Sequence, residues 1–150
     1  MTKKYNLEIT EEQAKTIMNA CEMFSRLQGG QWKDVFEWLP IKKDIDYKVL
    51  HQVEDTIQCM MPSILKDDVD GVSSSFGVGY PELDKSHDIS WEIHCAIRHK
   101  LSWERAVEDG IVESETSSRK WPEMMTVDYD PPMRWSTEPL VKITQITENQ

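Results

Sequence analysis

Apolar residues recur at three- and four-residue intervals in four stretches of the chain, which is typical of helices that bury one face. The first stretch follows Thr10, and Thr10–Gln13 has the composition of a capping box. It ends at Gly29-Gly30, where glycine tolerates the positive φ that closes many helices. The predicted helices cover residues 10–27, Gln31–Leu39, Asp44–Met61 and Asp88–Arg105.

Both ends of the chain alternate between apolar and polar residues, the period of a half-buried strand. Near the N-terminus the apolar positions are Tyr5, Leu7 and Ile9. Near the C-terminus, Met125–Tyr129 alternates and Leu140–Ile143 can supply a return strand. These patterns predict an α+β fold with about four helices packed on a small antiparallel sheet, which the N-terminal strand and a C-terminal hairpin would form.

The length of 150 residues suits one domain, so we expect residues 1–150 to share a single core. Two segments break the regular pattern. Lys66–His87 predicts a long loop, and Ile111–Arg119 is acidic and serine-rich, which predicts an exposed and mobile segment.

The balance of 17 basic and 27 acidic residues gives a net charge of −10, which disfavours direct binding to nucleic acid or to an anionic membrane. No apolar run approaches the roughly 20 residues that span a bilayer. The three cysteines are far apart, which favours free thiols in a reducing compartment. We therefore expect an intracellular protein.

The helix predicted over Asp88–Arg105 carries two stripes. The apolar stripe should face the core and contains Ile89, Ile93, Ala96 or Ile97, and Leu101. On another side, Trp91, His94 and Arg98 share a face, and Trp103 closes the helix. An aromatic ring and a guanidinium together can stack a base and bind phosphate oxygens. The structural alternative is that Trp91 belongs to the core or to an oligomer contact and that Arg98 pairs with a nearby acid.

The small-residue stretch Phe76–Tyr80 is a second candidate for ligand contact, as a lid or a phosphate loop. It contains GxG but lacks the complete GxGxxG and GK[ST] motifs. A tight packed turn is the alternative for Phe76 and Tyr80, because glycines mostly serve turns.

Catalytic and metal motifs are weak. His94 and His99 would point about 140° apart on a helix, so they cannot ligate one ion from one face. Asp88 and Glu92 are four residues apart and could act as acid and base, but such acids also suit the first turn of a helix. We expect no catalytic residue, no metal and no cofactor.

Four stretches of the chain carry a resemblance to known proteins. They are Ile9–Lys15 through Phe24–Arg26 and Gly30–Trp32; Ser74–Gly79; Asp88–His94 through Ile97–Trp103; and Val127–Met133 through Leu140–Ile143. Together they resemble a group of small uncharacterised proteins encoded by tailed phages and prophages. The resemblance covers most of the chain, is weakest over Ile111–Met124, and implies a phage origin without bringing an activity.

Phage accessory proteins of this size and acidity are often counter-defence factors, an association that rests on analogy. The leading hypothesis is a non-enzymatic homo-oligomer in the cytoplasm of the infected bacterial host that sequesters a nucleotide-type immune signal. One alternative is an acidic inhibitor, either a plug or a nucleic-acid mimic, of a host defence, transcription or replication protein. A second alternative is a nucleotide-directed enzyme.

Overall fold

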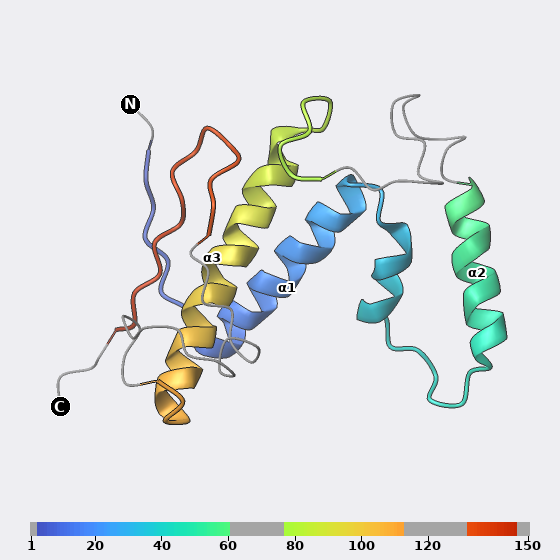
Figure 1. Ribbon diagram of the computed structural model, residues 1–150, viewed down its shortest axis with the longest axis horizontal. Coiled ribbons are helices and arrows are strands. Elements are labelled where there is room, and N and C mark those ends of the chain that lie inside the picture. Colours follow the sequence, from blue (N-terminus) through green and yellow to red (C-terminus); the bar gives the residue numbers. More distant parts are fainter. Residues whose placement is uncertain (1–2, 61–76, 113–131, 147–150) are drawn as a thin grey trace.

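The computed structural model describes residues 3–60, 77–112 and 132–146. In these residues the chain forms helix α1 (Glu11–Gln28), the 3-10 helix η1 (Trp32–Trp38), helix α2 (Tyr47–Met60) and helix α3 (Lys85–Glu108). Helices α1 and α3 pack side by side, and η1 contacts both α1 and α2 (Figure 1). Helix α2 therefore stands at one end of the molecule, away from the α1–α3 pair.

The two ends of α1 follow from local sequence. The Thr10 hydroxyl accepts a hydrogen bond from the Gln13 N–H at 3.2 Å, and the Gln13 side chain accepts one from the Thr10 N–H at 2.9 Å. At the other end Gly30 has φ of 81°, and the Gln31 N–H reaches back to the Arg26 carbonyl at 2.8 Å. Both the predicted capping box and the predicted glycine termination are confirmed.

Helix α3 begins three residues earlier than its periodicity predicts. The Asp84 side chain caps it by accepting a hydrogen bond from the Ser86 N–H at 2.8 Å. It ends like α1, because Gly110 has φ of 69° and the Ile111 N–H bonds to the Ala106 carbonyl at 2.9 Å. The early start brings His87 into the first turn of the helix.

The predicted α+β fold is wrong: the described residues form helices and no strand. The N-terminal segment is extended, but Tyr5 is 87% exposed and Leu7 is 73% exposed. Alternating apolar and polar residues allow a segment to bury one face in a sheet, but a strand also needs a neighbouring strand that completes its hydrogen-bond ladder. Residues 132–146 do not provide one, and the expected hairpin strand Met125–Tyr129 lies outside the described residues.

The core lies between α1 and α3. Its fully buried apolar residues in the described chain include three alanines, which let the two helices approach closely. Of the predicted stripe on α3, Ala96 and Ile97 are buried, whereas Ile89, Ile93 and Leu101 are half-buried. The buried apolar residues are Ala14, Ala96, Ile97, Trp103 and Ala106, and the buried polar residues are Ser25, His87, Glu92 and His94.

The structure describes a part of each predicted loop. Residues 77–84 of the loop Lys66–His87 form turns, whereas Lys66–Phe76 and residues 113–119 of Ile111–Arg119 lie outside the described chain. Among the helices that the structure describes, none has the length and apolar character needed to cross a membrane.

Candidate functional site

A small cleft forms where the C-terminal end of α1 meets the first two turns of α3. Its volume is about 210 Å³. The turn Gly77-Val78 closes one side. The side chains that line it are Ser25, Arg26, Gln31, His87 and Trp91. The cleft thus brings together a cation, an indole, an imidazole and two further polar groups.

Arg26 is the charged group of the cleft, and carboxylates hold it in place. Its Nε donates to Glu22 at 2.8 Å, and its Nη1 donates to Asp34 and to the Gln31 side chain, each at 2.7 Å. Burial works against the charged form, but Glu22 and Asp34 outweigh it and raise the pKa of Arg26 above its ordinary value. The guanidinium lies 6.0 Å from the centre of the Trp91 ring, which is within the range of a cation–π contact.

The ring of His94 packs against the ring of Trp91. The two rings stack with centroids 5.2 Å apart and planes 29° apart. His94 is only 2% exposed, and its Nδ1 lies 3.2 Å from the Met18 carbonyl of α1. Nδ1 therefore carries the proton and donates a hydrogen bond to that carbonyl. Burial lowers the pKa of His94, which keeps the ring neutral near pH 7. His94 therefore packs behind Trp91, in the seam between α1 and α3.

His87 reaches the cleft from the first turn of α3. It is 3% exposed, and its Nδ1 lies 3.0 Å from Oδ1 of Asp88. A carboxylate only accepts hydrogen bonds, so Nδ1 is the donor and Nε2 is the ring nitrogen that is left for a ligand. The same Asp88 oxygen accepts the Gly79 N–H at 2.8 Å, which ties the turn at the rim of the cleft to α3.

The structure separates the side chains that the sequence grouped as one ligand stripe. Trp91 lines the cleft, His94 lies behind it, and Arg98 is half-buried further along α3, outside the cleft lining. Trp103 is buried edge-on against His99, with ring centroids 6.2 Å apart. The two loop candidates do not join them: Tyr80 is half-buried and outside the cleft lining, and Phe76 lies outside the described residues.

Sequence reasoning missed Arg26 and His87 as cleft residues. Each had a local signal, since Arg26 precedes the glycines that end α1 and His87 follows Asp84, a good N-cap residue. These signals locate two helix ends. They do not indicate that the two ends meet, which depends on how α1 and α3 pack. The guanidinium beside Trp91 therefore comes from α1 instead of from Arg98.

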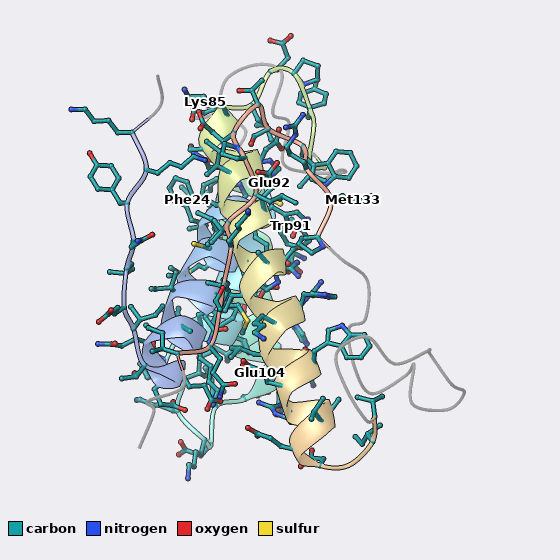
Figure 2. The ribbon with its side chains drawn as sticks, turned by 90° about the vertical axis from the view of Figure 1, so that its left-hand side faces the viewer. Phe24, Lys85, Trp91, Glu92, Glu104 and Met133 are labelled. Carbon is teal, nitrogen blue, oxygen red and sulfur yellow. The ribbon has the colours of Figure 1, made fainter. Side chains whose placement is uncertain are left out.

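Glu92 lies on another face of α3 and is 3% exposed. Its Oε1 accepts hydrogen bonds from the N–H groups of Trp135 and Ser136, and its Oε2 accepts one from the Ser136 hydroxyl at 2.8 Å. The C-terminal segment accordingly crosses α3 at the level of Glu92 (Figure 2). Asp88 and Glu92, the two carboxylates that the sequence offers as an acid–base pair, thus each accept hydrogen bonds from their own chain.

Within the part of the chain that the structure describes, no three His, Cys, Asp or Glu side chains come together in a way that could hold a metal ion. No protein-family model matches the sequence, and neither a curated protein nor a solved structure matches it significantly.

Proposed function

We propose that this protein is a phage accessory protein that counters a host defence by binding, without chemistry, a nucleotide-type signal molecule in the cleft between α1 and α3. The observation that carries the proposal is the convergence of Arg26, Trp91 and His87 on one small cavity. A guanidinium and an aromatic ring form the pair of groups that recognises an anionic ligand with a planar base.

The remaining lining residues fit the same ligand class. Ser25 and Gln31 bring a hydroxyl and an amide, and His87 offers Nε2 as an acceptor when neutral or as a donor when protonated. Such groups match the mixed donors and acceptors on the edge of a nucleobase. Asp34 already forms an ion pair with Arg26, so a ligand phosphate would compete with that carboxylate for the guanidinium.

The size of the cleft limits what it can hold. Pockets for drug-sized ligands measure roughly 300–1,000 Å³, and this one measures about 210 Å³. It can take one base or one phosphate group of a larger signal molecule. The rest of the ligand would lie outside the cleft, where a second copy of the chain would cover it. This is the reason that we propose a homo-oligomer, acting in the cytoplasm of the infected host.

The phage setting comes from the resemblance of the four sequence stretches, and the cleft supports the binding part of the proposal. Titration calorimetry of the full chain with a cyclic dinucleotide, AMP and ADP-ribose tests that part. We expect at least one of them to bind. Absence of heat for all three up to high micromolar concentration would reject the nucleotide proposal.

Two variants tie the binding to the cleft. Trp91→Leu and Arg26→Lys should each weaken binding by about tenfold, because one removes the ring and the other removes the planar fork. Arg105→Gln is the matched control, since Arg105 is exposed in the last turn of α3. Equal loss in the control would point to a general electrostatic effect.

A second candidate function is inhibition of a host protein, and α2 is the observation that favours it. Tyr47, Val49, Val53 and Met60 are between 43% and 74% exposed on this helix. Exposed apolar groups of this kind mark protein–protein contacts more often than small-molecule sites. A partner with a basic surface would suit the net charge of −10.

A pull-down from host lysate after nuclease treatment tests this second candidate. A stoichiometric host protein should be lost with Val53→Asp and kept with His51→Asp, because the exposed His51 lies about 160° around the same helix from Val53. Retention of that protein by both variants would show that α2 is not the contact.

A further inference from the structure

The buried Glu92 carboxylate is connected to the cleft through a series of contacts. Its two backbone donors are consecutive, Trp135 and Ser136, so the carboxylate fixes the position and the direction of the chain at that point. The Ser136 hydroxyl adds a third bond and also accepts the Glu138 N–H at 3.2 Å. Three hydrogen bonds to one buried charge make this the most strongly anchored point that we see in residues 132–146.

The next contact runs from Trp135 to the turn at the rim of the cleft. Gly79 has φ of 80°, and a Cβ at that position would lie 3.2 Å from Cε3 of Trp135. The indole therefore packs directly on the Gly79 backbone. A side chain at this position would have to displace the ring, and the positive φ would also strain it.

The last contacts return to the cleft. The Gly79 N–H donates to Asp88 at 2.8 Å, and the same oxygen holds His87, which lines the cavity. The preceding residues of the turn, Gly77 and Val78, line it as well. A displaced Trp135 would release Gly79, and a released Gly79 would change both the turn and the bond that orients His87.

We propose that Glu92 is a positioning residue for the cleft, acting through Trp135, Gly79 and Asp88 on His87 without touching the ligand. The inference rests on the proposed ligand-binding function for its consequence, but its geometry can be tested without any ligand. It assigns to the C-terminal segment the role of holding the cleft in its binding shape.

The ligand-free test uses NMR signals of the backbone amides and of the His87 ring, recorded at one pH. In Glu92→Ala the amide signals of Trp135, Ser136 and Gly79 should shift, and so should the ring signals of His87. Ser136→Ala removes the two hydrogen bonds of the hydroxyl, to Glu92 and from the Glu138 N–H, but keeps the carboxylate and its two backbone donors, so it should give smaller shifts at the same positions. It also keeps the test valid if Glu92→Ala does not fold.

The matched control is Glu104→Ala. Glu104 lies on the same helix, toward its other end, and pairs with Lys100 at 3.3 Å (Figure 2). This change should leave Gly79 and His87 unaffected. Glu92→Gln is the rescue variant, because an amide keeps one oxygen for the two backbone donors. It should restore the Gly79 signal more fully than alanine does.

With a ligand that binds the wild type, Glu92→Ala should weaken binding by about tenfold, the lower end of the loss seen when a group that orients a metal ligand is removed. Glu104→Ala should not change the affinity. Unchanged Gly79 and His87 signals in both Glu92→Ala and Ser136→Ala would overturn the inference whether or not a ligand binds. Failure of every ligand to bind the wild type, with the signals shifted as expected, would reject the proposed function and leave the positioning role supported.

Discussion

The α1–α3 pair and helix α2 use their apolar residues in opposite ways. In the pair, Ile97 and Ala106 are 4% and 1% exposed, and the buried Glu92 carboxylate accepts hydrogen bonds from the C-terminal segment. On α2, Val53 is 43% exposed and Met60 is 63% exposed, and η1 is the described element that contacts it. The two regions belong to one chain but differ in how completely their amphipathic faces are covered.

This difference separates stability from interaction. Free energy of folding should be concentrated in the α1–α3 pair, because burial of apolar area is the dominant stabilising term. The cleft is built on that rigid pair, as a site that must hold its geometry requires. The exposed face of α2 contributes less to folding and is correspondingly available to a partner.

The largest expected contrast comes from truncating one aliphatic side chain in each region. Ile97→Ala should lower the free energy of unfolding by about 3 kcal/mol, because it leaves a cavity in the α1–α3 core. Val53→Ala should cost less than about 1 kcal/mol, because the side chain is half in water. Denaturant unfolding measures both changes, and equal costs would show that α2 shares the main core.

Hydrogen exchange should show the same contrast without a mutation. Amides in the middle of α3 should exchange through global unfolding, whereas those of α2 should exchange through local opening, about 100-fold faster after correction for intrinsic rates. The comparison is made by NMR on the wild-type chain. Similar protection in the two helices would mean that they unfold as one unit.

The helix caps should sharpen the comparison at a smaller scale. Thr10→Ala removes the cap of α1 and should lower global stability by about 1 kcal/mol. Asp46→Ala removes the hydrogen bond that the Lys48 N–H donates to Asp46 at the start of α2, and it should speed exchange in α2 while leaving the global midpoint nearly unchanged. A global loss from Asp46→Ala as large as that from Thr10→Ala would contradict the division.

The smallest effect that we expect is on pH dependence. Burial lowers the pKa of His94 in the folded state. As the pH falls below about 6.5, His94 of the unfolded chain therefore takes up a proton at a higher pH than His94 of the folded chain does. Stability should therefore be full above that pH and decline toward the lower folded pKa. Between pH 7.5 and 5.5 this decline should flatten in His94→Asn and persist in His51→Asn, because His51 is exposed. Identical slopes in all three proteins would assign the decline to other groups.

Local patterns predicted the helices well and the sheet poorly. The capping box at Thr10 and the glycines after α1 act through neighbours in sequence, and both were predicted correctly. The alternation of Tyr5, Leu7 and Ile9 was misleading, because a strand depends on a distant partner that local sequence does not specify. In residues 132–146 the backbone N–H groups of Trp135 and Ser136 likewise donate to a side chain, Glu92, instead of to a neighbouring strand.

The candidate site also combines a residue that the local pattern predicted with residues that only tertiary packing brings in. Trp91 was recognised from its spacing along α3, because residues on one helix face follow from the helical period alone. Arg26 and His87 join it only through the packing of α1 on α3, and the role of Glu92 requires the return of the chain more than 40 residues later. The sequence by itself therefore determined the helices, the two ends of α1 and the acidic charge, all of which rest on short-range bonds and composition. The tertiary structure decided which helix ends meet, which guanidinium lies beside Trp91 and which carboxylate is buried, because these depend on contacts between segments that are far apart in the chain.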